Sequence, residues 1–527
     1  MNQLRAALTI LDEKCLVSST QWLSEFMQHT SPTQRIAEIV SQNYYEQYPQ
    51  NLTLEYKVAK IHFKNHEFEA ASKSIEQVEA FESNRSFLFL WCYSKYMAVQ
   101  ERVLIEFHKK QQDNLFEPYP ILSTAELSAI TSHLEPCMKS GCSDAFLLYI
   151  YGLCIKQEAP YRALRAFTSA VKEFPLFWGA WEELLSVTVT RSDLLFVLKH
   201  TDDSVIRDLF WIALMNRMNE IGVPPSVLDR LDRCASRWWF YSFQKALLQY
   251  HKGDEAEATR ILEATLKTEY RAVVAETLAS ILFAAKKEVS LMLLASQAAA
   301  TLPHASSSSF IAGCLYHLKH DLQPAAHYYT RVLTLHPQHE LAWSLMGQLS
   351  METAQTAQAL KAFQRAAAIN PRSSTHFYHI GLVYELMAAP SSSVFYYQKA
   401  VELRPYNPQM RVALGEGYLA CGEAEKAMEC YLVAESLGEE EGLSSRRLGK
   451  LYAEQGHEVE AAYFNRRCLM KKHFVICDND SYEPAVALCQ YYKKMGNTER
   501  LREIGAMLLA ANDETVQQQA RVLMSDN

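Results

Sequence analysis

The sequence predicts an all-α protein built from repeated helix pairs, and two observations lead to this prediction. Helix breakers are scarce, since the 527 residues include only 17 glycines and 17 prolines while 49% of residues are hydrophobic. Such a composition favours long stretches of helix. In the second half of the chain, glycines recur at a constant interval of 34 residues, at Gly313, Gly347, Gly381, Gly415 and Gly449. A chain of this length needs several domains or one repetitive architecture, and the constant interval favours repeats.

Other residue types keep the same interval. Prolines fall at Pro337, Pro371 and Pro405, and tyrosines at Tyr384, Tyr418 and Tyr452, with Tyr316 in phase and Ser350 as the exception. Alanines fall at Ala325, Ala359, Ala427 and Ala461, with Ser393 in place of the missing member. Thirty-four residues is the length of the helix-turn-helix tetratricopeptide repeat (TPR). The sequence therefore predicts TPR units stacked into a right-handed superhelix in which each pair contacts only its neighbours.

Each recurring residue has an expected packing role. In the clearest copy, Trp343 fills the space between stacked pairs and Gly347 lets a neighbouring helix approach closely. A glycine in a helix interior costs about 1 kcal/mol, so its recurrence implies that close approach returns more than this. In the second helix, Ala359 and Phe363 lie on one face. Pro371 ends that helix because a proline has no N–H to continue the helical hydrogen bonds.

The regularity of the pattern divides the chain into four predicted regions. Residues 1–175 form an N-terminal helical and TPR region, which we expect to be a homodimer interface, and residues 176–305 form degenerate TPR-like repeats. Residues 306–475 form the regular repeats with a peptide-binding groove, and residues 476–527 form C-terminal degenerate or capping helices. We expect a loop between Asp113 and Thr124, where prolines interrupt the helical pattern.

Charge and composition argue against several classes of protein. The net charge of −8 gives no basic surface for a phosphate backbone, so we expect no nucleic-acid partner. The longest apolar runs are interrupted by residues such as Glu276 and fall short of the ~18 residues that a membrane span needs, so we expect no membrane partner. Twelve cysteines without a signal-peptide pattern at Met1–Lys14 predict reduced thiols in the nucleus and cytoplasm.

No catalytic, cofactor-binding or metal-binding motif is present. Phosphate-loop, nucleophile-elbow and zinc-protease patterns are all missing from the sequence. Cys137 and Cys142 have no second ligand pair with structural-zinc spacing, and His62 and His66 have no nearby third ligand. The acidic run at residues 439–441 is interpreted as a solvated turn that precedes a helix.

Polar residues expected to face the groove are the candidate binding site. Successive first helices present Cys314 and His317, Gln348 and Glu352, Tyr378 and Glu385, Glu416, and Arg446 and Lys450. Carboxylates on adjacent units could receive the guanidinium of an Arg-bearing peptide, and Tyr378 could supply an aromatic face. We expect Glu385 and Glu416 to be exposed. A set of ordinary solvated helix carboxylates is the alternative reading.

The chain also resembles a known family, the subunit-eight TPR proteins of the anaphase-promoting complex, a multisubunit ubiquitin ligase. The most specific match is the string Trp178-Gly179-Ala180-Trp181, which generic TPRs lack. The segments from Leu16 to Glu25, from Val58 to Ala71 and from Phe87 to Tyr96 are similar as well. Downstream, Ala342–Gly347 and Leu403–Glu416 continue the likeness. Cys314 departs from the polar amide expected in the groove.

The resemblance implies a non-catalytic scaffold subunit. Its implied partners are other TPR subunits, a second copy bound through the N-terminal repeats, a small extended subunit along the TPR lobe, and a coactivator with an Arg-containing motif. The matching groove positions are Tyr378, Glu385 and Glu416, with Gln348 and Glu352 weaker. Two alternatives remain, namely a generic TPR adaptor of a transport or RNA-processing assembly, and a TPR-bearing enzyme. Fewer than ~60 residues lie outside the repeats, which is too few for a catalytic domain.

Overall fold

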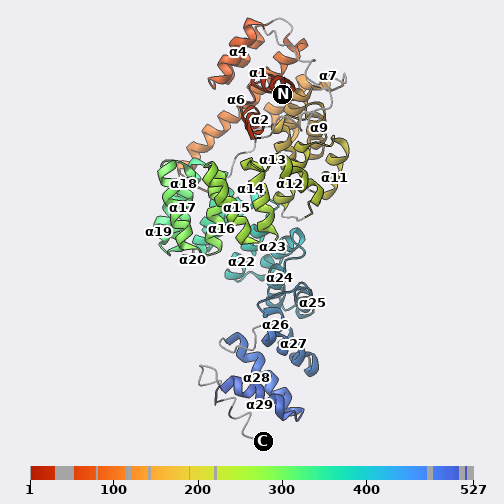
Figure 1. The fold of residues 1–527 in the computed structure, drawn as a ribbon, viewed down its shortest axis with the longest axis vertical. Helices are drawn as coiled ribbons and strands as arrows, with labels where there is room; N and C mark the ends of the chain where they lie inside the picture. The colour runs from red at the N-terminus through yellow and green to blue at the C-terminus, as the bar shows by residue number, and fades with distance from the viewer. Residues whose placement is uncertain are drawn as a thin grey trace. The chain divides into compact units, whose positions relative to one another are not determined.

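The computed structural model describes residues 2–29, 53–78, 81–113, 124–139, 144–188, 190–218, 222–471 and 479–509, together with 115–116, 120, 122, 517–518 and 521. Within these residues the chain forms 28 α-helices and no strand, and most of the helices pack as antiparallel TPR-like pairs (Figure 1). The all-α prediction is confirmed. The chain divides into two compact units, residues Met1–Ala342 and Trp343–Asn527.

The first unit contains the N-terminal helices and the helix pairs up to Leu335. Its helices are α1 (Asn2–Glu13), α2 (Val17–His29), α4 (Leu54–Lys64), α5 (Phe68–Glu76), α6 (Arg85–Asp113), α7 (Thr124–Lys139), α8 (Ala145–Ile155), α9 (Pro160–Glu173), α10 (Trp178–Val187), α11 (Arg191–His200), α12 (Val205–Met218), α13 (Pro225–Ala235), α14 (Trp239–His251), α15 (Glu255–Thr268), α16 (Ala272–Ala284), α17 (Glu288–Thr301), α18 (Ser306–Leu318) and α19 (Leu322–Leu335). A short 3-10 helix, η2 (Phe81–Ser83), precedes α6.

The second unit contains the most regular pairs. Helix α20 (Glu340–Glu352) begins just before the boundary, and the rest follow as α21 (Thr356–Ile369), α22 (Ser374–Leu386), α23 (Pro390–Leu403), α24 (Pro408–Ala420), α25 (Ala424–Ser436), α26 (Leu443–Glu454), α27 (Glu458–Lys471), α28 (Asn479–Lys494) and α29 (Thr498–Leu509). From α18 to α24 the first helices begin exactly one period apart, at residues 306, 340, 374 and 408.

The recurring glycines lie where the two helices of a pair meet. A Cβ added to Gly347 would stand 2.7 Å from the Phe363 ring, and one added to Gly381 would stand 2.5 Å from the Tyr397 ring. The corresponding Cβ would meet Tyr329 at Gly313, Tyr431 at Gly415 and the Asn465 amide at Gly449. An aromatic ring of the second helix therefore occupies the space that a side chain would fill in four of these five pairs.

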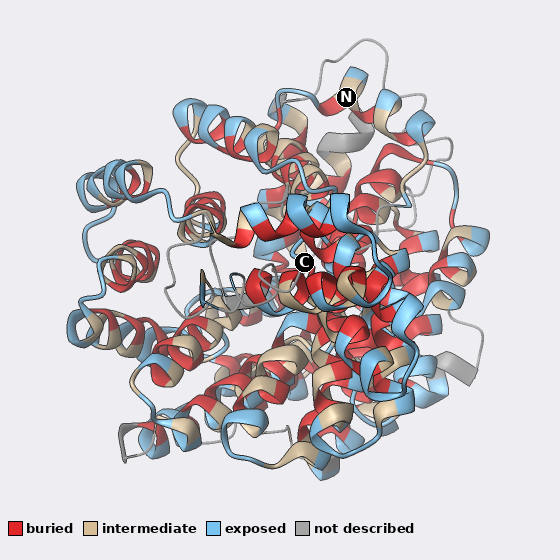
Figure 2. Ribbon diagram, turned by 90° about the horizontal axis from the view of Figure 1, so that it is seen from below, coloured by how far each residue is buried: buried red, intermediate tan, exposed pale blue. Residues whose placement is uncertain are grey.

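The other recurring residues occupy the pair boundaries and the core. Trp343 is only 2% exposed. Pro337, Pro371 and Pro405 each lie in the turn that follows a second helix, two residues after its last residue. Buried positions face neighbouring helices and exposed positions face outward throughout the described chain (Figure 2).

A second ladder, which the sequence did not predict, lies in the turn between the helices of each pair. The backbone takes a left-handed conformation every 34 residues, at Lys286, His320, Ala354, Ala388, Gly422 and Gly456, with φ between 53° and 82°. Each of these residues follows a first helix and reverses the chain into the second. Only two of the six positions carry glycine, the residue that adopts this conformation without a steric penalty.

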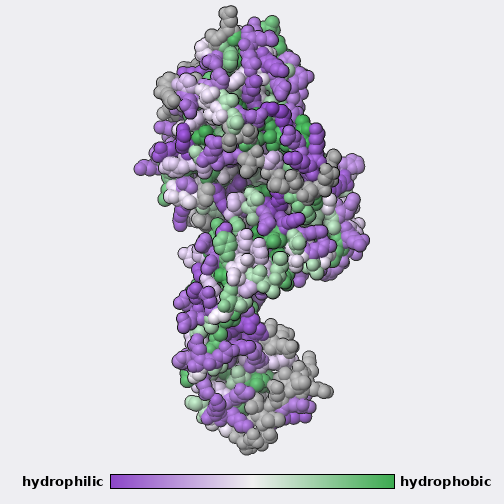
Figure 3. Space-filling view, turned by 180° about the vertical axis from the view of Figure 1, so that it is seen from behind, coloured by the Kyte–Doolittle hydropathy of each residue, from purple (hydrophilic) through white to green (hydrophobic). Residues whose placement is uncertain are grey.

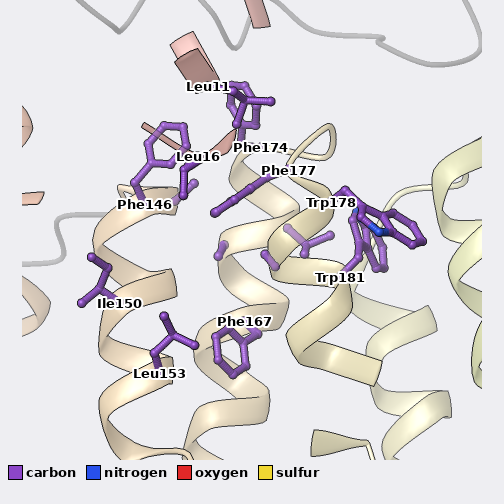
Figure 4. Close-up of a cluster of buried hydrophobic side chains, with 14 of the residues drawn as sticks. Leu11, Leu16, Phe146, Ile150, Leu153, Phe167, Phe174, Phe177, Trp178 and Trp181 are labelled. Carbon is purple, nitrogen blue, oxygen red and sulfur yellow. The ribbon is translucent and has the colours of Figure 1, made fainter. Parts of the chain in front are cut away.

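The N-terminal helix α2 packs deep in the first unit. The Trp22 ring stacks on Trp178 with centroids 4.3 Å apart, and the Ser19 hydroxyl accepts a hydrogen bond of 3.0 Å from the Gly179 N–H. Farther along α2, Glu25 accepts a hydrogen bond of 2.9 Å from the Trp239 indole. Helix α2 thus packs against the string from Trp178 to Trp181. Figure 4 shows the two tryptophans of this string beside the buried phenylalanines of α9 and of the turn that follows α9.

Long-range contacts also tie α6 into the first unit. The Gln111 side chain at its end donates a 2.9 Å hydrogen bond to the Leu333 carbonyl on α19, although the two residues are 222 positions apart. The prediction that each pair contacts only its neighbours is therefore wrong for this unit. The recurring residues predict contacts within a pair and between adjacent pairs, and they do not predict a contact between helices as distant in sequence as α6 and α19.

Candidate peptide-binding site

A cavity of about 310 Å³ opens on the second unit between α22, α24 and the turn before α26. Its lining combines apolar, aromatic and acidic side chains, namely Tyr378, Leu382, Glu385, Tyr397, Gln409, Val412, Ala413, Glu416, Glu439, Glu441 and Leu443. Helical spacing explains the set, because Tyr378, Leu382 and Glu385 follow one face of α22. The cavity brings together Tyr378, Glu385 and Glu416, three of the five groove positions that the family resemblance matches.

Glu385 is an exposed carboxylate held by one hydrogen bond. The buried Tyr397 hydroxyl donates to its Oε2 at 2.7 Å. No Lys or Arg among the described residues lies within ion-pair distance of Glu385, so its negative charge is not neutralised by a neighbour. Burial, followed by this contact with Glu385, raises the pKa of Tyr397, which keeps the phenol protonated and able to donate.

Glu416 differs from the prediction, because it is neither exposed nor unpaired. Its side chain is 23% exposed, and the Arg447 guanidinium binds both carboxylate oxygens at 2.7 Å. The Tyr431 hydroxyl donates a third hydrogen bond, of 2.9 Å, to Oε1. The sequence could not predict this pair, since Arg447 lies 31 residues away on the next first helix. A bidentate Arg leaves Glu416 with little net charge to offer a ligand.

The acidic run before α26 is only in part the solvated turn that was predicted, because Glu440 and Glu441 are exposed but Glu439 is buried. Glu439 is 5% exposed, accepts a 2.9 Å hydrogen bond from the Ser444 hydroxyl and pairs with Lys471 at 3.2 Å. Glu441 is exposed at the cavity, and no described Lys or Arg is paired with it. Sequence reasoning missed Glu441 as a site residue, although its place beside a repeat boundary that lacks the expected proline was a usable signal.

Tyr378 lines the same cavity as the two unneutralised carboxylates, Glu385 and Glu441. Burial raises the pKa of its phenol, and the negative charges of Glu385 and Glu441 raise it further. Both carboxylates therefore act on the same hydroxyl group. The Tyr378 ring also packs near Tyr397, with centroids 5.8 Å apart. The arrangement offers a cationic ligand two carboxylates and an aromatic surface.

The remaining predicted groove positions lie outside this cavity. Gln348 is half-buried and Glu352 is exposed, but neither lines it. Cys314 and His317 are 0% and 2% exposed, so the prediction that they face a groove is wrong. Their side chains turn into the first unit, where His317 Nδ1 lies 3.3 Å from the Tyr329 hydroxyl.

The last two groove positions are on α26. Arg446 is half-buried. Lys450 is exposed, and its Nζ lies 3.8 Å from Glu483 Oε1 on α28. Neither residue lines the cavity, so no described cation on its wall competes with a ligand for Glu385 and Glu441.

Metal and membrane features were searched over the described residues. They contain no group of three or more His, Cys, Asp or Glu side chains placed to hold a metal ion. No described helix is both long and apolar enough to cross a membrane. Hydrophilic residues dominate the face drawn in Figure 3, with hydrophobic residues scattered among them.

Comparison with known proteins agrees with the fold. A family model described as Anaphase promoting complex subunit 8 / Cdc23 matches residues 1–221, and a tetratricopeptide repeat model matches residues 377–407. The crystal structure of the APC/C hetero-tetramer Cut9-Hcn1 superposes with a TM-score of 0.52 at 14% identity, over 90% of this chain and 96% of that chain. At this identity the superposition shows a shared fold.

Curated relatives carry the same family name. Anaphase-promoting complex subunit 8 of Arabidopsis thaliana is 25% identical over 397 residues, which are 67% of this chain and 66% of the relative. The Dictyostelium discoideum protein of that name is 24% identical over 212 residues, which are 40% of this chain and 36% of the relative. The matches thus span less than two thirds of each relative's length. Over residues 1–221 the chain is similar to the anaphase-promoting complex subunit 8 (Cdc23) family, and it carries TPR-type helix pairs downstream.

Proposed function

We propose that this chain is a non-catalytic scaffold subunit of the anaphase-promoting complex, the cell-cycle ubiquitin ligase, and that it works in the nucleus and cytoplasm. The family match supports membership of the complex. Stacked helix pairs over most of the described chain suit a protein that binds other polypeptides over an extended surface. Its proposed partners are other TPR subunits, a small extended subunit and a second copy of the chain bound through residues 1–175.

We also propose that the cavity of the second unit binds an Arg-containing peptide of the coactivator. The observation that carries this proposal is the pair of unneutralised carboxylates, Glu385 and Glu441, that line one cavity with Tyr378. A guanidinium can donate to both carboxylates and stack on the phenol ring. The apolar side chains of Leu382, Val412 and Leu443 would cover an adjacent apolar residue of the peptide. Gln348 and Glu352 remain proposed contacts outside the cavity.

A titration tests the peptide site. A fluorescent coactivator peptide with one Arg is titrated with the full chain, and the same peptide with citrulline in place of Arg is the ligand control. Glu385→Gln and Glu441→Gln should each weaken binding by roughly fivefold, because a charge-assisted contact at an exposed site contributes about 1 kcal/mol. Glu429→Gln, an exposed carboxylate on α25 outside the cavity, should change nothing. Equal affinity for the Arg and citrulline peptides would refute the site.

Membership of the complex is tested separately. The tagged chain should co-purify with a cullin-type and a RING-type subunit. Light scattering of the isolated chain should give twice the monomer mass of 60.2 kDa, and deletion of the first ~170 residues should abolish the dimer. Purification without the other subunits, or a monomer at micromolar concentration, would contradict the corresponding part of the proposal.

A further inference from the structure

The rings that pack on the recurring glycines fall into two chemical kinds. Tyr397 and Tyr431 are fully buried, yet each hydroxyl reaches the first helix of its pair and donates to a carboxylate, Glu385 at 2.7 Å and Glu416 at 2.9 Å. Both carboxylates line the cavity described above. Two buried residues of the second helices are thus linked by hydrogen bonds to the polar groups of the site.

The chain itself shows that the hydroxyl is not needed for packing. In the pair of α20 and α21, Phe363 takes the same place against Gly347, fully buried, at 2.7 Å from an added Cβ, where the Tyr397 ring is at 2.5 Å from one added to Gly381. Four residues after the glycine, that pair carries Met351 where α22 carries Glu385. The phenylalanine accompanies an apolar neighbour, whereas Tyr397 and Tyr431 accompany carboxylates and the Tyr329 hydroxyl lies 3.3 Å from His317 Nδ1. The hydroxyl therefore goes with a polar partner on the first helix and is not needed to fill the space beside the glycine.

We propose that Tyr397 is a positioning residue of the peptide site, whose hydroxyl orients the Glu385 carboxylate toward the cation of the bound peptide. This inference rests on the proposed function of the cavity. An unrestrained glutamate on a helix surface samples several rotamers, and ordering it on binding costs affinity. The Tyr397 hydrogen bond restricts Glu385 before the peptide arrives, while the second carboxylate oxygen stays available to the ligand.

The same reasoning predicts a difference between the two tyrosines. Glu416 is held by Tyr431 and also by two hydrogen bonds from Arg447, so removal of the Tyr431 hydroxyl leaves its carboxylate in place. Glu385 has no such second holder among the described residues. Tyr431→Phe is therefore a matched control, because it removes a buried hydroxyl from a carboxylate in the same way without freeing that carboxylate.

The test is a thermodynamic cycle on the full chain with the Arg peptide. Tyr397→Phe should raise Kd about fivefold, and Tyr431→Phe less than twofold. In a chain that already carries Glu385→Gln, the further change Tyr397→Phe should have no effect, because there is no charged group left to orient. Unchanged affinity of Tyr397→Phe, or the same fivefold loss in the Glu385→Gln background, would overturn the proposal. Both variants are expected to fold, because Phe363 already fills the equivalent position in the pair of α20 and α21.

A crystal structure of the Tyr397→Phe chain gives a readout that needs no peptide. The Glu385 carboxylate should leave the position it holds beside residue 397, whereas Glu416 should stay on Arg447. An unmoved Glu385 would overturn the positioning role whatever the peptide does. Failure of the wild-type chain to bind the Arg peptide, or full binding by Glu385→Gln, would instead refute the proposed function of the cavity, and the crystal structure would still decide the role of Tyr397.

Discussion

The left-handed turns of the repeats allow a reciprocal exchange of alanine and glycine whose two halves have opposite expected signs. Ala388 has φ 55° and Gly422 has φ 81°, at the same place in successive pairs. An added Cβ at Gly422 meets nothing within 4 Å, so packing does not enter. Ala388 is also exposed. At both positions, the effect of exchanging alanine and glycine on the free energy of unfolding therefore depends on the backbone preference of the two residue types alone.

The magnitude follows from two opposing effects. A side chain in the left-handed region costs about 1–2 kcal/mol. A glycine makes the unfolded chain more flexible, which costs about 0.4–1 kcal/mol of stability. Ala388→Gly should therefore stabilise the second unit by roughly 0.5–1 kcal/mol, and Gly422→Ala should destabilise it by about the same amount. For a unit of this size, 1 kcal/mol shifts Tm by roughly 2–4 °C.

Thermal and urea unfolding, followed by circular dichroism, measure both variants. Ala368→Gly is the control, because Ala368 is exposed within α21 and its replacement should destabilise by about 1 kcal/mol through helix propensity. The same substitution thus has opposite signs at two exposed positions. If Ala388→Gly destabilises as Ala368→Gly does, or if Gly422→Ala is neutral, the backbone explanation of the turn is refuted.

Three other perturbations test the packing and the buried charges. Gly415→Val places a branched side chain against the Tyr431 ring and should cost roughly 1–3 kcal/mol in urea unfolding. Gly222→Val should not share this loss, because Gly222 is exposed and an added Cβ there meets nothing within 4 Å. Lys14 is 4% exposed, and burial lowers its pKa from the ordinary 10.5 to about 8. Between these two pH values the unfolded chain binds more protons than the folded chain, so the free energy of unfolding rises with pH across that window. Lys14→Met should flatten that part of the pH profile of Tm, and an unchanged profile would contradict the burial argument. Burial raises the pKa of Glu435, but hydrogen bonds from Lys471, Ser444 and Ser445 outweigh burial and hold the pKa below its ordinary value of 4.5. The stabilisation by the charged Glu435 is therefore lost as the pH falls below about 4.5. Lys471→Met should cost up to about 3 kcal/mol near pH 7 and progressively less in acid, and a pH-independent loss would refute the pairing.

Much of the fold was predictable because the recurring residues act locally. The glycine interval fixes the helix pairs, and each glycine faces the side chain sixteen residues later in the same pair, which is an aromatic ring in four of the five. The turn ladder escaped prediction because His320, Ala354 and Ala388 take a backbone conformation that their residue types rarely adopt. The contact of α2 with Gly179 and the contact of Gln111 with Leu333 were not predicted, because each joins residues more than 150 positions apart.

The candidate site was predictable in part for a similar reason. Helical spacing brought Tyr378 and Glu385 to one face, and the structure places both at the cavity. The charge state of the site depends on neighbours from other pairs, which periodicity does not reveal. Arg447 neutralises Glu416 and Lys471 pairs with Glu439, so two of the four carboxylates at the cavity are already compensated, and the remaining two, Glu385 and Glu441, are the ones a ligand would meet.

The long-range contacts of the first unit bear on how this chain can change over evolution. In the second unit the hydrophobic clusters are separate and form between adjacent helices, around Tyr397 in one case and Tyr431 in another. A duplicated or deleted pair there would leave the clusters on either side intact. In the first unit one continuous cluster runs from Ala7 to Tyr241, and Gln111 reaches α19 across many intervening helices. Gain or loss of a pair there would disrupt the continuous cluster and the contact of Gln111 with α19. The number of repeats can therefore change more easily in the second unit than in the first.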